Sequence, residues 1–288
     1  MRPSTTAILA AALGLTVAGT ASAADLPIAP IGTGSKTCVP KREASCNAIK
    51  AIGANFAGKD LRGVRFDKAK LRGANFVGAD LRGVSFRGAK LGGADFSYAK
   101  LKGAQFGAPK GARKRVDQAQ PAPGCYPGCS GADLRGANFT GANLTNASFT
   151  YARLTSANLS TATLTSTDLT GAELSSANFT YAHMWYANLS ANFGNANLFG
   201  ADLTYANLTY AFLGSASLAE ANLTSANLTR AYLASANLTG TNFLSANLTS
   251  ANLTSANLTN ANLFGANLTG AYWSNTTCPN RTVTSTGC

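Results

Sequence analysis

Basic side chains recur at a fixed interval in the first third of this chain, and they are the residues best suited to bind a ligand. Residues 36–115 contain 19 Lys and Arg against 5 Asp and Glu, a balance of +14, whereas residues 116–288 have a balance of −2. Rows of cations attract a polymer of phosphates or uronates, although charge can also serve only to keep a protein soluble. Within each of two groups of these cations the members are twenty residues apart. Arg72 lies midway between Arg62 and Arg82. The candidate anion-binding residues are Arg62, Arg82 and Lys102, then Lys70 and Lys90, then Arg72.

Residues that could catalyse a reaction or hold a metal are sparse. His183 is the single histidine, and a surface contact explains it better than the role of a catalytic base. The CYPGC stretch is a CxxxC, whereas redox centres use CxxC. We therefore expect no enzyme activity, no catalytic residue, no metal site and no cofactor.

The six cysteines form an even set and lie in three local clusters. Six cysteines allow fifteen pairings, and the clustering favours pairs between near neighbours. The expected disulfides are Cys38 with Cys46, Cys125 with Cys129, and Cys278 with Cys288.

A repeat of five residues must position these side chains. Each unit is a small residue, Asn or Asp, Leu or Phe, and two mostly polar or small residues, as in ANLTSANLTSANLTN at 246–260. Helical faces need a period near 3.6 and strands alternate at 2, so a period of five predicts a coil with corners. The small and large apolar residues then point inward. The large residue marks eleven repeats from Phe56 to Phe106, twelve from Leu134 to Leu189, and seventeen from Phe193 to Trp273.

The repeat resembles the pentapeptide-repeat family, whose motif is A[DN]LxX. The resemblance implies an all-β fold, a right-handed quadrilateral β-helix with about 20 residues per coil and roughly ten coils with one irregular break. Side chains twenty positions apart would then be neighbours about 4.8 Å apart on adjacent coils. A one-residue deletion in LSANF shifts this phase, so Asp202 is expected one coil above His183.

Composition divides the chain into six segments. Arg2, an apolar run at 7–18 and Ala21-Ser22-Ala23 are typical of a secretory signal peptide, which predicts a secreted or periplasmic protein. No later stretch has the length of apolar residues that a membrane helix needs. The 107–131 segment breaks the period and could be a loop on one rod or a linker between two. The segments are a signal peptide (1–23), an N-terminal entry or cap segment (24–53), a basic repeat block (54–106), a Pro/Gly/Cys-rich loop or linker (107–131), a near-neutral repeat block (132–274) and a disulfide-capped C-terminal tail (275–288).

The near-neutral block offers a second candidate surface. Asn and Thr recur there at intervals of twenty and would form two parallel columns, a flat face able to match a polysaccharide or ice. Duplication of one repeat unit would also produce such ladders without a ligand. The columns are Asn207, Asn227, Asn247 and Asn267, and Thr209, Thr229, Thr249 and Thr269.

A core filled from four sides leaves no small-molecule pocket, so any function belongs to the outer surface. We expect an exported, non-catalytic scaffold whose basic block binds an anionic envelope or extracellular polymer. The alternatives are the flat Asn/Thr face as a binder of polysaccharide or ice, and a purely structural spacer. Some members of the resembling family protect DNA gyrase by imitating the negative surface of DNA, but the basic charge of this chain argues against that role. The sequence leaves the oligomeric state open.

Overall fold

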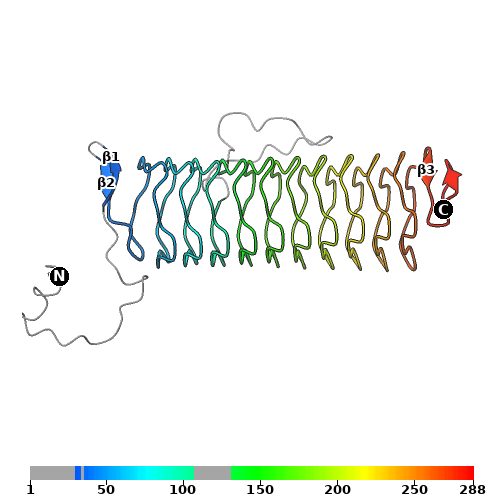
Figure 1. The fold of residues 1–288 in the computed structure, drawn as a ribbon. Coiled ribbons are helices and arrows are strands. Elements are labelled where there is room, and N and C mark those ends of the chain that lie inside the picture. The colour runs from blue at the N-terminus through cyan, green and yellow to red at the C-terminus, as the bar shows by residue number, and fades with distance from the viewer. Residues whose placement is uncertain (1–29, 34–35, 107–130) are drawn as a thin grey trace, which may run out of the picture.

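The computed structural model describes residues 30–33, 36–106 and 131–288 of the 288-residue chain, and these form one straight rod of stacked coils (Figure 1). The predicted signal peptide, the Cys125 and Cys129 pair, and all of the 107–131 segment except Gly131 lie outside the described residues.

Each coil has four sides and pairs with the next coil through parallel β-bridges. The second residue of each repeat makes the bridge, and its partner lies twenty residues further on, as in Asn55 with Asn75. This arrangement confirms the predicted quadrilateral β-helix. We name the four faces A, B, C and D in chain order, so that A is opposite C and B is opposite D. Their bridging residues begin with Ser45, Arg65 and Ser85 (A), Lys50, Lys70 and Lys90 (B), Asn55, Asn75 and Asp95 (C), and Asp60, Asp80 and Lys100 (D).

The corners are β-turns, which is why the period is five. The Ala54 amide donates to the Ala51 carbonyl at 3.3 Å, and Gly53 between them has φ +67°. A positive φ at the third turn position is the mark of a type II turn. Thr161 takes this position at φ 55° and is the one β-branched residue with a positive φ in the described ranges. A branched Cβ makes that conformation costly.

The core is a column of apolar side chains without a lumen. Leu and Phe at the third repeat position are fully buried, and Ala at the first position fills the space beside them. Phenylalanines on faces A and C stack along the rod, with Phe76 and Phe96 centroids 4.8 Å apart and 3° from parallel. Stacking on neighbouring coils therefore supplies the burial that one coil lacks.

The ladder continues across the segment that breaks the sequence period. Lys90 bridges to Asp133, 43 residues further on, whereas bridges between coils that lie on one side of the segment, such as Lys70 with Lys90, span twenty. Phe96 stacks on Phe139 at 4.9 Å and 4°. The two repeat blocks thus form one continuous rod, as Figure 1 shows from cyan to green. Beyond it, His183 bridges to Asp202 after 19 residues, so the one-residue deletion shifts the phase as predicted.

Short hairpins lie at both ends of the rod (Figure 1). At the N-terminal end, β1 (Ile31–Thr33) pairs antiparallel with β2 (Lys36–Cys38). At the C-terminal end, β3 (Thr276–Thr277) pairs antiparallel with β4 (Val283–Thr284).

A disulfide lies at each hairpin, and the pairing matches the sequence prediction for four of the six cysteines. The bonds are Cys38 to Cys46 and Cys278 to Cys288. Ile31 and Cys38 pack against the core at the N-terminal end. The C-terminal tail covers less, because the inward residues Leu263 and Leu268 of the last coil are only partly buried.

Candidate functional site

The arginines of the predicted column lie at the corner that follows face D, on successive coils. The Gly63 amide donates to the Arg82 carbonyl, and the Gly83 amide donates to the Lys102 carbonyl, each at 3.1 Å. Each arginine, however, is bonded to the aspartate two residues before it. Arg62 donates to both carboxylate oxygens of Asp60 at 2.9 and 2.6 Å.

Arg82 repeats this arrangement with Asp80, at 2.8 and 2.6 Å. The Arg82 side-chain hydrogen bond is the main reason that the pKa of Asp80 lies below its usual value. Arg62 also lies 3.7 Å from Asp80, so acid and base alternate up the corner. The like-charge repulsion expected between these arginines is therefore relieved within the protein, and little of their charge is left for a ligand.

Face B has the opposite character. Lys50, Lys70 and Lys90 follow one another on successive coils and are exposed. Among the described residues, no carboxylate lies within 4.0 Å of any of their amines. Lys68 and Arg72 stand at the two corners that border Lys70, and both are exposed. Face B thus carries a cluster of cations in which like charges are adjacent.

Asp133 ends this cluster on the next coil above Lys90. It is 4% exposed and accepts hydrogen bonds from Arg135 at 2.8 and 2.9 Å. That pairing is the main cause of the lowered pKa of Asp133. Arg72 also reaches the same carboxylate, at 3.9 Å. Above Asp133, Arg153 pairs with Glu173 at 3.2 Å, so the excess positive charge stops there.

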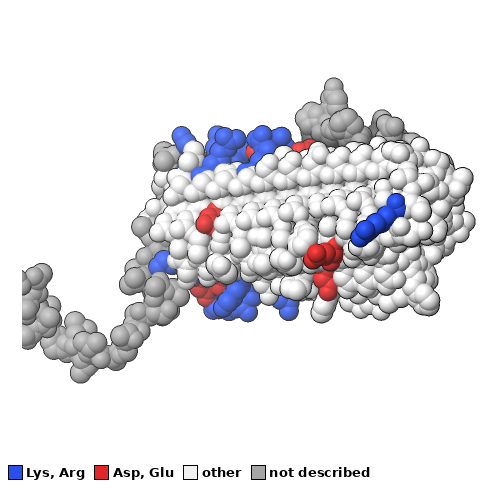
Figure 2. Space-filling view, turned by 45° about the vertical axis from the view of Figure 1, so that its right-hand side comes forward, with Lys and Arg blue, Asp and Glu red and all other residues white. Residues whose placement is uncertain are grey.

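Figure 2 shows basic side chains gathered in the N-terminal part of the rod at two opposite margins of the view, with mainly uncharged and some acidic surface between them. Faces B and D are opposite each other, and they differ in pairing. Face D and its corner hold interleaved aspartates, whereas face B below Asp133 holds lysines alone at its bridging positions. Face B is therefore the stronger candidate for an anion-binding site.

The predicted Asn/Thr columns lie on face A, and each Asn and Thr of a repeat bind each other. Asn227 accepts from the Thr229 amide at 3.0 Å and from its hydroxyl at 2.6 Å. Asn207 also donates to Asn188 at 3.3 Å. Within the described part of the chain, the side-chain NH2 groups of Asn227, Asn247 and Asn267 donate no hydrogen bond to a neighbouring coil, and only their Oδ1 atoms are engaged. Unengaged donors thus recur on successive coils, with Thr249 and Thr269 alongside.

His183 lies on face D beside Asp202, as the bridge between them shows, and its side chain is exposed. In the described ranges there is no group of three or more His, Cys, Asp or Glu that could hold a metal ion. The same ranges contain no helix with the length and apolar character of a membrane span.

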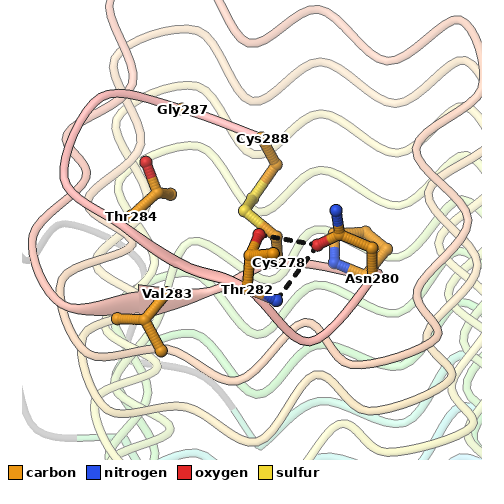
Figure 3. A pocket seen from close by; sticks show the side chains of 8 residues that line it. Cys278, Asn280, Thr282, Val283, Thr284, Gly287 and Cys288 are labelled. Carbon is orange, nitrogen blue, oxygen red and sulfur yellow. Dashed lines mark hydrogen bonds between the residues drawn. A yellow bond between two sulfur atoms is a disulfide. The ribbon is translucent and has the colours of Figure 1, made fainter.

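A depression of about 470 Å³ lies in the C-terminal tail. The disulfide forms part of its wall, and Thr282 donates to the side-chain Oδ1 of Asn280 from its amide at 3.1 Å and from its hydroxyl at 2.7 Å (Figure 3). None of the residues that line it has a side chain that could act as an acid or a base, since both cysteines are joined in the disulfide. Its lining residues are Cys278, Pro279, Asn280, Thr282, Val283, Thr284, Gly287 and Cys288.

Sequence reasoning missed two members of the face B cluster. Lys50 lies twenty residues before Lys70, so its interval was the signal that could have found it. Lys68 lies at the corner between faces A and B, so it is found only when corner residues are grouped with the bridging residues of the neighbouring face. Conversely, the acidic partners of Arg62 and Arg82 were visible as the Asp-x-Arg spacing.

A family model for pentapeptide repeats matches this chain in several overlapping segments. The matched ranges are 44–83, 74–107, 129–165, 157–191, 196–233 and 226–263.

Among solved structures, HetL from the cyanobacterium Nostoc sp. strain PCC 7120, a pentapeptide repeat protein involved in the regulation of heterocyst differentiation, is 30% identical. That match covers 84% of this chain and 92% of HetL, with a TM-score of 0.46. QnrB1, a plasmid-mediated fluoroquinolone resistance protein, is 19% identical over 79% of this chain and 91% of its own, with a TM-score of 0.39. A thylakoid-lumen pentapeptide repeat protein from Arabidopsis thaliana is 31% identical over 43% and 66% of the two chains, with a TM-score of 0.21. No curated protein matches the sequence.

Proposed function

Because this chain belongs to the pentapeptide-repeat family of right-handed quadrilateral β-helices, we propose that it is a non-catalytic scaffold that acts through its outer surface and binds an anionic polymer along face B. The observation that carries this proposal is the row of Lys50, Lys70 and Lys90, whose amines have no carboxylate partner among the described residues. Successive coils are about 4.8 Å apart, so this row presents regularly spaced positive charges parallel to the rod axis.

The competing explanation is that positive charge serves solubility alone. Solubility requires net charge but does not explain why Arg62 and Arg82 are paired with aspartates at the D corner, whereas the bridging lysines of face B have no carboxylate partner in the described part of the chain. Adjacent like charges repel, and a bound polyanion relieves that repulsion. The pairing at the D corner and its absence on face B therefore favour a ligand on face B.

We further propose that the chain is exported, since residues 1–23 have the pattern of a signal peptide and the disulfides suit an oxidising compartment. An envelope or extracellular polymer of phosphates or uronates would then be the available partner. Imitation of DNA is not proposed, because the formal net charge of the chain is +12.

The test compares two variants that lose the same charge from opposite sides of the rod. One combines Lys50→Gln, Lys70→Gln and Lys90→Gln, and the other combines Arg62→Gln, Arg82→Gln and Lys102→Gln. Gln105 and Asn55 already occupy bridging positions like those of the three lysines, and Asn47 occupies a corner position like that of Arg62, so amide side chains fit at both kinds of position. On immobilised heparin and on immobilised polyphosphate, we expect the first variant to elute at much lower salt than the second. Equal loss in both variants would show that only net charge matters and would contradict the proposal.

A second candidate function is binding of an ordered polysaccharide or of ice by the Asn/Thr columns of face A. The unengaged amides of Asn227, Asn247 and Asn267 favour it. Thr229→Tyr with Thr249→Tyr would obstruct face A, whereas Thr239→Tyr with Thr259→Tyr would obstruct face C. Thermal hysteresis, or pull-down on insoluble glycans, that is lost in the first pair and kept in the second would support this function. Equal behaviour of both pairs would exclude it.

A further inference from the structure

Three exposed aromatic side chains lie together at the corner that follows face D, well above the basic block. Trp185, Tyr186 and Tyr205 are 46%, 60% and 52% exposed, and we call them the aromatic ridge. The Tyr186 amide donates to the Thr204 carbonyl at 3.2 Å, which places Tyr186 and Tyr205 at the same corner position on successive coils. Neither the charge pattern nor the Asn/Thr columns accounts for them.

The two tyrosine rings of the ridge stack on each other, and both side chains remain more than half exposed. Their centroids are 5.1 Å apart, and the rings are 4° from parallel. Ser166 and Ser225 occupy the same corner position on the coils before and after, because their backbones follow the same hydrogen-bond ladder. A serine is too small to cover a phenol ring. Together with the exposure of both side chains, this leaves part of each ring accessible to a ligand.

The surroundings of the ridge are polar. On the face D side lie His183, Asp202 and Thr204, and the Thr204 hydroxyl donates to Asp202 at 2.6 Å. On the face A side lie Asn188 and Asn207, joined by a 3.3 Å hydrogen bond. The bridging and corner positions next to the ridge thus supply hydroxyl, amide, imidazole and carboxylate groups.

This combination fits a sugar better than an apolar protein surface. The core of a protein interface is apolar and poor in charged residues, whereas here flat rings alternate with groups that donate and accept hydrogen bonds. A pyranose ring has the complementary chemistry, with C–H groups on its faces and hydroxyls around its rim. Tyr and Trp combine an apolar body with a polar end. The lysine cluster of face B is several coils away, so a neutral sugar suits the ridge.

We propose that the aromatic ridge is a binding site for a neutral glycan. Sugar rings stack on the outer faces of Tyr186 and Tyr205 and on Trp185, while Asp202 and Asn207 bind the hydroxyls beside them. The site is independent of the anionic-polymer proposal because it shares no residue with face B.

Tryptophan fluorescence gives a direct test, since the chain has 2 Trp and Trp273→Phe leaves Trp185 as the reporter. The full-length mature chain with this change is titrated with chitohexaose, cellohexaose and maltohexaose at about 0.5 M NaCl, where charge attraction is largely screened. We expect a saturable change in Trp185 emission with at least one of these probes. Addition of Tyr186→Ser and Tyr205→Ser should weaken binding by about tenfold or more.

Tyr98→Ser is the matched control, because Tyr98 is 68% exposed but lies at another corner within the basic block. It should leave glycan binding unchanged. Serine already occupies many such corner positions, so neither variant should disturb the fold. Three results would overturn the proposal: no saturable signal with any of the three glycans, unchanged binding in the Tyr186 and Tyr205 variant, or a wild-type dimer in sedimentation that this variant dissociates. The last would identify a second copy of the chain as the occupant of the ridge.

Discussion

Replacement of residues 107–131 by the dipeptide Thr-Gly should leave the rod intact. The Ala132 amide donates to the Phe106 carbonyl at 2.8 Å, and the same hydrogen bond closes most of the ordinary two-residue corners of the rod. Phe106 and Ala132 are therefore already at the separation that a two-residue turn spans. Glycine at the second position accepts the positive φ that such turns require.

The expected effect on stability follows from the length of chain removed. The entropy of closing a loop grows as about (3/2)RT ln n, so shortening 25 residues to 2 should stabilise the fold by roughly 2 kcal/mol. The packing across the junction does not change, because Phe106 already stacks on Phe149 at 4.5 Å and 3°. We therefore expect the free energy of unfolding to rise by about 2 kcal/mol.

Denaturant unfolding followed by circular dichroism measures this change. A full-length variant with Cys125→Ser and Cys129→Ser is the control, because the deletion also removes these two cysteines. A shortened chain that unfolds at lower denaturant than this control, or in two separate transitions, would refute the continuous rod and favour two rods joined by a linker.

Three further changes test the account. Thr161→Gly should stabilise the fold by about 1 to 2 kcal/mol, because it removes a β-branched residue from a left-handed conformation; no gain in chemical denaturation would contradict this. Phe96→Ala should cost about 3 to 5 kcal/mol, since its ring is fully buried between two stacked neighbours, whereas Phe264→Ala at the exposed end should cost little in the same assay. The ionised Asp133 carboxylate stabilises the fold, as its lowered pKa indicates. This stabilisation is complete at a pH above the ordinary aspartate pKa of about 3.9, and it is lost as the pH falls from there toward the lowered pKa. Asp133→Asn should therefore flatten the acid limb of a stability profile and, by removing a negative charge from the end of face B, should raise the salt needed to elute the protein from heparin; an unchanged acid limb would argue against the linkage.

The fold was largely predictable because the period of five specifies it. An apolar residue at each fifth position permits few other packings, and Val64 and Val84, which replace the inward Ala, are fully buried. The pairing of His183 with Asp202 was also predictable, because a one-residue deletion in a strict repeat shortens the spacing between neighbours on adjacent coils from 20 to 19 residues. What the sequence left open was the continuity of the rod, because the bridge from Lys90 to Asp133 depends on packing between segments rather than on local pattern.

The candidate site was only partly predictable. The intervals placed Arg62 and Arg82 in one column, but the spacing of cations does not show which of them are neutralised. That depends on side-chain direction, and Asp60 and Asp80 point along the strand toward the arginines. The aromatic ridge was not predicted for a related reason. Its residues lie at corner positions, where the sequence has no regular column of one residue type.

The most direct test of the central claim is the salt dependence of polyphosphate affinity. The dissociation constant of a polyphosphate chain would be measured by calorimetry over a series of NaCl concentrations for the wild type and for the Lys50, Lys70 and Lys90 glutamine variant. If the three lysines bind the polymer, each releases counterions, and the slope of log affinity against log salt should fall by about 2 to 3. The same slope and the same affinity in both proteins would show that face B does not bind the polymer.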